Sequence, residues 1–344
     1  MDKTYVLDFA SRLLGTDSPT GYTKKAIDLV ADEAAALGYQ TKRNNKGNLL
    51  IYVKGSSSEK TIGFCAHCDT LGLMVRSIKS NGMLAVTNIG GPIIPTLDGE
   101  YCRIHTRDGR VYSGTVLSCS PASHVYKDAS TRKREVDEME IRIDEVVKTK
   151  ADVEALGICN GDFVAIDPKV QITESGFIKS RFLDDKISAS ALMGVLQHMK
   201  EHSITPAYDL IFMMSTYEEV GHGMSHIPEC ISELIAVDMG CIGLDLACSE
   251  QDVSICAKDS SGPYDYEMTS RLIELAKEKK LCYAVDIYPM YGSDVSAALR
   301  GGCDIRGALI GPGVHASHGM ERTHYDGVEN TMKLILAYIS QLSP

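Results

Sequence analysis

Three apolar segments of this chain each run directly into side chains of the types that bind metal ions. They are TIGFCAHCD (61–69), DLIFMMSTYEE (209–219) and ELIAVD (233–238). Carboxylates and imidazoles gathered at strand ends are costly to bring together unless a cation neutralises their charge. The three segments therefore favour a metal-dependent hydrolase over other classes of protein.

The first segment places His67 and Asp69 two residues apart at the end of a predicted strand. Alternate residues of a strand share a face, so the two side chains are expected to point the same way. A metal-bound histidine usually donates its second ring N–H to a carboxylate or a carbonyl group. We interpret His67 as a ligand and Asp69 as its orienting partner, although a turn-capping aspartate beside an incidental histidine explains this pair equally well.

At two places in the chain, two acidic residues are adjacent where a single one would suffice for structure. Asp184 and Asp185 open a predicted helix, and one aspartate is enough to cap it. Glu218 and Glu219 follow an apolar strand, and adjacent glutamates can divide metal binding and proton transfer between them. Asp238 ends the next apolar run in the same way. These acids are therefore candidate ligands, with one glutamate left free as a general base.

The loop HASHGMERTH (315–324) offers three histidines, of which one is expected to be a ligand. One histidine and two aspartates can hold one ion, while a shared aspartate, a glutamate and a second histidine can hold another. Such a mixed nitrogen and oxygen set suits Zn²⁺, Co²⁺ or Mn²⁺ and is unlike a thiolate site. The residue types thus predict two divalent cations.

The elements that must position these residues follow an α/β pattern. Helices are expected at 4–15 and 22–38, strands at about 39–54 and 61–67, and alternating helices and strands from Ser180 onward. This predicts an α/β fold of the zinc-peptidase type, with a mostly parallel sheet and helices on both faces. Ligands in such sheets gather at the carboxyl ends of the strands.

The middle of the chain has a different sequence pattern. Short runs of alternating apolar and polar residues are broken by Gly, Pro and Asp, and one helix is expected near 150–156. This pattern predicts a small β-barrel-like domain inserted into the α/β domain. The expected domains are therefore a catalytic one, 1–73 with 174–344, and an inserted one, 74–173.

The composition excludes several classes of partner. A net charge of −11 over 344 residues argues against nucleic acid or an anionic membrane as a partner. No apolar run approaches the ~18 residues of a membrane span. The N-terminus reads as an amphipathic helix and not as a signal peptide. The 11 scattered cysteines favour reduced thiols and a cytoplasmic location.

The motifs AHCDTLGLMV, FLDDK, STYEEVG, AVDMG and SHGMERTH…ENT, in this order, resemble those of a known family. It is the dinuclear metalloaminopeptidases of the glutamyl, deblocking and tetrahedral type, some of which are labelled endoglucanases. The resemblance spans nearly the whole chain. It implies hydrolysis of peptides with a free N-terminus, two divalent cations (Zn²⁺ or Co²⁺, or Mn²⁺), and an inserted domain that assembles twelve subunits into a hollow particle.

The resemblance also implies a role for each candidate ligand. Asp184 would bridge the two cations, and the peptide bond that follows it would be cis. His67 and Asp238 would complete one cation site. Glu219 and His318 would complete the other.

The remaining roles are catalytic. Glu218 would be the general base and Asp69 would orient His67. Two departures from the family pattern bear on these roles. Thr70 stands where the family often has a glutamate, and the loop length leaves His315 as a reserve for His318.

Other functions use similar residues. A dinuclear amidase or deacylase acting on small acylated amino acids would need the same ligands. A glycosidase (endoglucanase) also uses paired carboxylates, but it would give the histidines no purpose, and the chain has no tryptophan to stack on sugars. A non-catalytic assembly protein with this fold is expected to have lost its ligands, and here they are intact.

Overall fold

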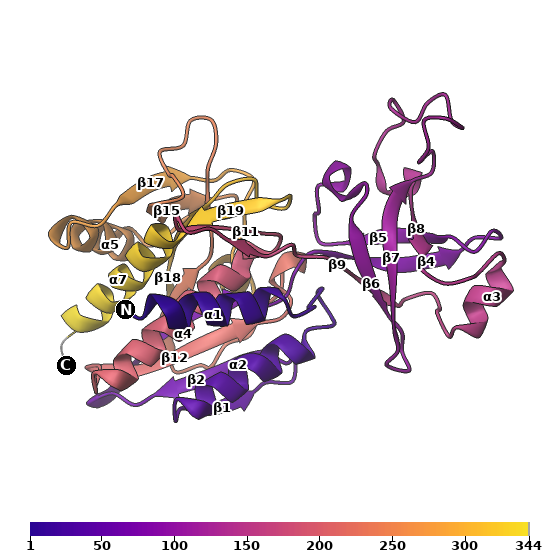
Figure 1. Ribbon diagram of the computed structural model, residues 1–344. Coiled ribbons are helices and arrows are strands. Elements are labelled where there is room, and N and C mark those ends of the chain that lie inside the picture. Colours follow the sequence, from indigo (N-terminus) through magenta and orange to yellow (C-terminus); the bar gives the residue numbers. More distant parts are fainter. Residues whose placement is uncertain (343–344) are drawn as a thin grey trace. The chain divides into compact units, whose positions relative to one another are not determined.

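The computed structural model describes residues 1–342, which divide into two compact units (Figure 1). One unit combines Met1–Asp69 with Lys169–Pro344, and the other is Thr70–Pro168. The sequence placed these divisions a few residues later, at 74 and 173. Within residues 1–342, no helix is both long enough and apolar enough to cross a membrane.

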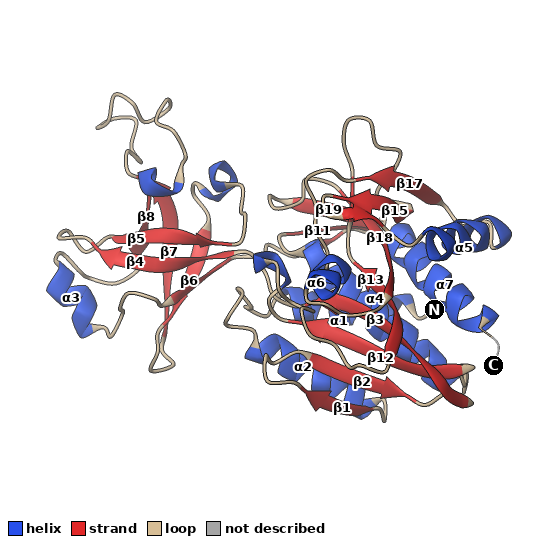
Figure 2. Ribbon diagram, turned by 180° about the vertical axis from the view of Figure 1, so that it is seen from behind, coloured by secondary structure: helices blue, strands red, loops and turns tan. Residues whose placement is uncertain are grey.

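The first unit is built on a ten-stranded sheet with the order β1-β2-β12-β3-β13-β18-β15-β16, in which β14 pairs with β18 and β17 with β15 (Figure 2). The strands are β1 (Gln40–Arg43), β2 (Leu49–Val53), β3 (Ser57–His67), β12 (Tyr208–Ser215), β13 (Ile231–Val237), β14 (Gly240–Cys241), β15 (Val253–Asp259), β16 (Gly262–Pro263), β17 (Tyr283–Ile287) and β18 (Arg306–Val314). The four central strands β12, β3, β13 and β18 are parallel, whereas antiparallel pairs flank them on both sides.

Helices cover both faces of this sheet. The helical elements of the unit are α1 (Lys3–Leu14), α2 (Lys24–Ala36), α4 (Leu183–Glu201), the 3-10 turn η3 (Glu218–Val220), α5 (Tyr266–Glu278), α6 (Asp294–Arg300) and α7 (Tyr325–Gln341). A small separate sheet joins β10 (Gln171–Ile172), β11 (Phe177–Ser180) and β19 (Glu321–His324).

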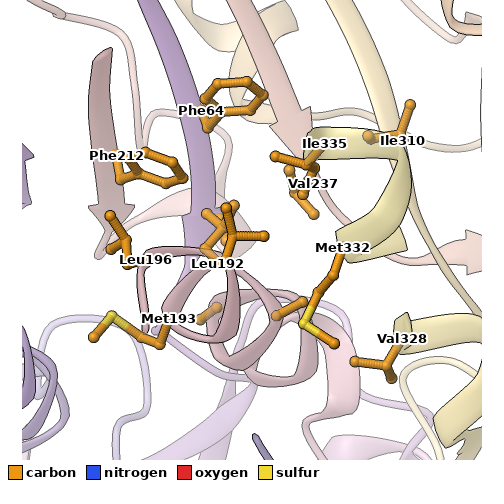
Figure 3. Close-up of a cluster of buried hydrophobic side chains, with 14 of the residues drawn as sticks. Phe64, Leu192, Met193, Leu196, Phe212, Val237, Ile310, Val328, Met332 and Ile335 are labelled. Atoms are coloured by element: carbon orange, nitrogen blue, oxygen red, sulfur yellow. The ribbon is translucent and has the colours of Figure 1, made fainter. Parts of the chain in front are cut away.

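The central strands are apolar on both faces because both faces are buried. Phe64 and Phe212 point from neighbouring strands toward α4, and their rings stack 5.2 Å apart (Figure 3). The next residue along β3, Cys65, points to the opposite face and packs in a second cluster with Val295 of α6. This alternation explains why β3 and β12 read as continuous apolar runs, and it confirms the predicted α/β class with helices on both faces.

The predicted strand at 39–54 is two strands joined by a tight turn. Asn44 Oδ1 accepts from the backbone N–H groups of Lys46 and Asn48, at 3.0 Å each. A side chain that satisfies its own backbone in this way competes with continued strand pairing. β1 and β2 therefore form an antiparallel pair around residues 44–48.

The second unit is a closed barrel with the order β4-β5-β8-β7-β6-β9, in which all neighbours are antiparallel. Its elements are β4 (Gly72–Ile78), β5 (Leu84–Ile89), η1 (Ile94–Leu97), β6 (Tyr101–His105), β7 (Val111–Ser118), η2 (Val136–Glu138), β8 (Met139–Ile143), α3 (Lys150–Ala155) and β9 (Phe163–Ile166). Closure removes unpaired strand edges. The barrel confirms the predicted β insertion.

Candidate metal centre

Parallel strands bring the predicted residues to one edge of the sheet. β12 lies beside β3 with Ser215 opposite His67, and β13 lies parallel on the other side of β3. Because the carboxyl ends of parallel strands meet at the same edge, His67 stands between η3, which follows β12, and Asp238, which follows β13.

A glycine on β18 sets the position of Asp238. The backbone N–H of Asp238 donates to Ile310 at 2.8 Å. A Cβ added at the next residue, Gly311, would lie 1.9 Å from the carbonyl oxygen of Asp238. Only a residue without a side chain allows this close approach, so β18 supports Asp238 from the side.

The start of α4 contributes Asp184. The peptide bond between Asp184 and Asp185 is cis, and both residues have non-helical backbone angles. Neither carboxylate acts as a simple helix cap. Asp185 Oδ2 accepts from the backbone N–H of His67 at 3.2 Å, while the oxygens of Asp184 face two histidines.

Asp184 lies between the imidazoles of His67 and His318. Its Oδ1 is 3.0 Å from Nε2 of His67, and its Oδ2 is 3.4 Å from Nε2 of His318. His318 Nε2 also lies 3.7 Å from Glu219 Oε2. The two oxygens of Asp184 therefore face two different imidazoles.

Ligand atoms form two groups of three, the atoms of each group lie within 4.8 Å of one another, and both groups contain His67. One group adds Glu218 and Asp238, and the other adds Asp184 and Glu219. All of the predicted acids therefore meet at one place. The first group contains Glu218 in place of the predicted Asp184, and the second contains His67 in place of the predicted His318. Distance alone therefore does not separate Glu218 from the ligands.

The other two histidines of the C-terminal loop lie apart from this cluster. His315 is exposed, and its backbone pairs with Arg322. His324 accepts from the backbone N–H of Asp326 at the start of α7, and its Nε2 is 2.8 Å from the carbonyl oxygen of Ser175. His318 is thus the histidine of this loop that faces the predicted acids.

Asp69 orients His67 through its backbone and not through its carboxylate. The Nδ1–H of His67 donates to the Asp69 carbonyl oxygen at 2.9 Å, whereas the carboxylate is 3.7 Å away. This hydrogen bond leaves Nε2, which faces Asp184, as the nitrogen able to bind a cation. The carboxylate of Asp69 instead accepts from Thr20 Oγ1 (2.7 Å) and from the N–H groups of Glu218 (3.1 Å) and Glu219 (3.3 Å).

Two residues of this region were not identified from the sequence. Glu321 is buried and accepts from the backbone N–H of Asp184 (3.1 Å) and of His318 (2.9 Å), so it joins two segments of the centre. Tyr291 donates from its hydroxyl to the Met239 carbonyl at 3.1 Å, beside Asp238. The only sequence signal for Glu321 was an acid within the histidine-rich loop.

Two further buried acids of this unit, Asp294 and Asp259, accept hydrogen bonds from neighbouring groups. Asp294 accepts from Ser215 Oγ (2.5 Å) and the N–H of Met224 (2.9 Å). Asp259 accepts from Tyr264 and from neighbouring backbone, and it is 1% exposed. Both carboxylates therefore hold loops together.

Crowding in a buried site shifts the acidities of these groups. Burial raises the pKa of Glu218 and of Glu219 well above the usual range, and it raises the pKa of Asp238 to about 7. Burial alone would lower the pKa of His67, but the hydrogen bond to Asp184 and the nearby acids raise it. A bound cation would stabilise the ionised form of these crowded, buried carboxylates.

The donor atoms fit divalent cations. They are imidazole nitrogens and carboxylate oxygens without a thiolate, a set that suits Zn²⁺, Co²⁺ or Mn²⁺. Glu219 Oε1 is buried and has no hydrogen-bond partner within residues 1–342. An unsatisfied buried carboxylate oxygen is costly, and a cation would satisfy it.

We expect the stability of the metal-free protein to fall as pH rises. A buried carboxyl with a raised pKa is neutral at low pH but must ionise unfavourably as pH passes that value. The raised pKa values of Glu218, Glu219, Asp238 and His67 all make the free energy of unfolding fall as pH rises. The lowered pKa of Asp184 acts oppositely, but only at more acidic pH.

Calorimetry with a chelator present tests this expectation. The Tm of the chelated protein should decline from about pH 5 to about pH 8, and added metal should restore most stability at the upper end. A Tm that is constant or increasing over this range in the chelated protein would contradict the assigned burial effects.

Comparison with known proteins gives consistent matches. The profile of the family described as M42 glutamyl aminopeptidase matches residues 47–334. The chain is 44% identical over 334 residues to YhfE of Bacillus subtilis (strain 168), which is named as a candidate aminopeptidase; the match covers 97% of this chain and 96% of YhfE.

Solved structures share the fold. A TET aminopeptidase from the marine sediment archaeon Thaumarchaeota archaeon SCGC AB-539-E09 superposes with a TM-score of 0.89 at 18% identity, covering 98% of this chain and 97% of that one. The TET1 peptidase of Pyrococcus horikoshii, described as assembling into a tetrahedron or a large octahedral shell, gives 0.85 at 20% identity, covering 98% and 100%.

Proposed function

Because this chain belongs to the M42 glutamyl aminopeptidase family and is an aminopeptidase, we propose that two divalent cations held at the carboxyl edge of its sheet support removal of N-terminal residues from peptides. His67, Asp184 and Asp238 hold one cation. Asp184, Glu219 and His318 hold the other. The supporting observation is that Asp184 lies between the two imidazoles, with one oxygen toward each.

Each residue of the centre has a separate task in this proposal. Bound divalent cations lower the pKa of water and polarise a carbonyl group. Glu218 accepts a proton from the attacking water and delivers it to the leaving amine. The carboxylate of Asp69 accepts from the N–H groups of Glu218 and Glu219, so it positions both the general base, Glu218, and the ligand, Glu219. Glu321 holds Asp184 and His318 at the correct spacing.

A panel of aminoacyl-anilides tests the proposed activity. We expect hydrolysis that a chelator abolishes and that Zn²⁺, Co²⁺ or Mn²⁺ restores, because the cations would activate the attacking water and polarise the carbonyl group. Comparing restored rates at equal occupancy would identify the supporting metal. Anilide hydrolysis that persists after metal content has fallen to background would contradict the proposal.

The same panel separates the alternative chemistries. N-acetylated versions of the same substrates should not be cleaved by an aminopeptidase, but they would be the preferred substrates of a deacylase. Activity on β-glucans that withstands the chelator would instead indicate a glycosidase.

We also propose that the barrel, residues 70–168, mediates assembly into twelve-subunit particles. Its exposed apolar side chains, which include Tyr101 and Val125, support an interaction role. Mass measurement in solution tests this proposal, and a monomer at micromolar concentration would contradict it.

A further inference from the structure

We propose that a basic pocket beside the metal centre binds a carboxylate on the leaving portion of the peptide substrate. The inference rests on the proposed aminopeptidase function and adds a substrate preference to it. The pocket has a volume of about 370 Å³ and lies at the start of α2, next to the β1–β2 turn. Its lining includes Tyr22, Lys24, Lys25, Arg43, Lys46 and Tyr217. We call it the basic pocket.

One side of the basic pocket is attached to the catalytic groups through Asp69. Thr20 donates to the Asp69 carboxylate at 2.7 Å, and the pocket lining begins at the next residue, Gly21. The same carboxylate accepts from the N–H of Glu218, and Tyr217 of the lining directly precedes that residue. On two separate segments, a lining residue of the pocket is therefore the chain neighbour of a residue that contacts Asp69. These neighbours are Gly21 beside Thr20 and Tyr217 beside Glu218.

A second set of contacts ties the basic pocket to the loop that follows Glu219. Lys46 Nζ donates to Ser225 Oγ at 2.7 Å and to the carbonyl oxygen of His222. Thr216 Oγ1 in turn donates to the Lys46 carbonyl at 3.2 Å. The ring of Tyr217 stacks on His222 with centroids 5.0 Å apart. These contacts hold the pocket wall in a defined position relative to Glu218.

The lining carries an excess of positive charge in an acidic protein of net charge −11. Lys24 and Arg43 share one carboxylate, Asp28, at 2.7 Å each. Within residues 1–342, Lys25 and Lys46 have no carboxylate at ion-pair distance. The Lys46 ammonium already donates to the wall of the pocket, so it contributes charge only. Four cations against one acid still give the lining a net positive charge, and Lys and Arg bind carboxylates through charge-assisted hydrogen bonds.

The direction of the substrate leads the leaving portion toward this pocket. In the proposed mechanism Glu218 delivers a proton to the leaving nitrogen, so that nitrogen lies beside Glu218. The leaving portion begins at this atom. Consecutive Cα atoms are about 3.8 Å apart, so the wall at Tyr217 is within reach of the first or second residue after the scissile bond. A carboxylate there comes either from the C-terminus of a short peptide or from an Asp or Glu side chain.

Two substrate pairs test the inference and distinguish these sources. Leu-Ala-Ala as free acid and as C-terminal amide differ only in the terminal carboxylate. Leu-Asp-Ala-amide and Leu-Asn-Ala-amide differ only in the side-chain carboxylate. We expect the charged member of at least one pair to have about tenfold higher kcat/KM, an advantage that shrinks as salt is added. The pair that shows the advantage identifies the source.

Charge variants locate the effect in the basic pocket. The charged-to-neutral ratio of kcat/KM should fall toward one in Lys25→Gln and Arg43→Gln, and it should drop below one in Lys25→Glu. Lys60→Gln removes the same charge from an exposed site at the other end of β3, so it is the matched control and should keep the wild-type ratio. Using the ratio within each variant cancels general losses of activity.

The outcomes separate this inference from the proposed function. If the wild-type protein cleaves leucyl-anilide but treats both pairs alike, the inference about the pocket is wrong and the aminopeptidase assignment stands. If the ratio changes equally in Lys60→Gln and Lys25→Gln, the preference comes from overall charge, and the pocket inference is again wrong. If neither leucyl-anilide nor any peptide is cleaved with metal present, the proposed function fails first.

Discussion

Replacing Glu218 by glutamine should lower kcat by about three orders of magnitude and leave the metal content unchanged. Glutamine has the same shape but cannot accept a proton, and general base catalysis contributes about 10²–10⁴-fold. Glu218 is half-buried, and the hydrogen bond from its backbone N–H to Asp69 is independent of its side chain. The backbone of the centre should therefore survive the substitution. Steady-state kinetics with elemental analysis on the same sample provides the measurement.

The neighbouring acid is the matched control for this experiment. Glu219→Gln removes a charge one residue away, but Glu219 faces His318 and is proposed to be a ligand. This variant should lose metal occupancy before it loses turnover per bound metal. If instead Glu218→Gln loses metal and Glu219→Gln retains it, the two roles must be exchanged. Full turnover with normal metal in both variants would refute the assignment of either residue.

The second large effect is expected at Asp184. Asp184→Asn replaces the carboxylate between His67 and His318 by a neutral amide. Losing only an outer partner of a metal ligand costs about 10–100-fold in affinity. The loss of a bridging charge should therefore weaken binding of both cations by more than about 100-fold. Activity should fall at least as far at a fixed metal concentration.

Thermal stability gives this prediction a readout independent of activity. Metal at about 100 times its Kd stabilises a protein by about 2.7 kcal/mol, so wild-type Tm should rise on metal addition. The rise should vanish in Asp184→Asn and persist in part in His318→Ala, which keeps the other proposed cation site. Asp209→Asn, which removes an acid paired with Lys54 at the far end of β12, should respond like the wild type. A normal metal-dependent rise in Asp184→Asn would contradict the bridging role.

Several parts of the fold were predictable because local patterns encode them. The C-terminal parts of β3, β12 and β13 are buried on both faces, so each ends in an apolar run. The acids and histidine that follow such runs could therefore be placed at one edge. The barrel was predictable for the same reason, since short alternating strands with frequent turns are a local signal.

Other parts depend on contacts that no local pattern encodes. The break between β1 and β2 comes from Asn44 bonding to its own turn, which a strand-like composition hides. His67 donates to the backbone carbonyl of Asp69 and not to its carboxylate, because the carboxylate already accepts hydrogen bonds from Thr20 and from the N–H groups of η3. Glu321 lies 137 residues from Asp184 along the chain. Each of these contacts forms only after distant segments have packed.

The sequence by itself determined which residue types stand at the strand ends and which chemistry such a set can support. Apolar alternation and doubled acids are local properties of the chain, and the family motifs are read in order along it. The resemblance favoured His318 over His315 as a ligand, and the tertiary structure shows that His318 is the one that faces Asp184. It also placed Lys25, Arg43 and Lys46 around one cavity beside Glu218. The physical reason is that loop conformations and meetings between remote segments are set by packing and hydrogen bonding across the whole unit.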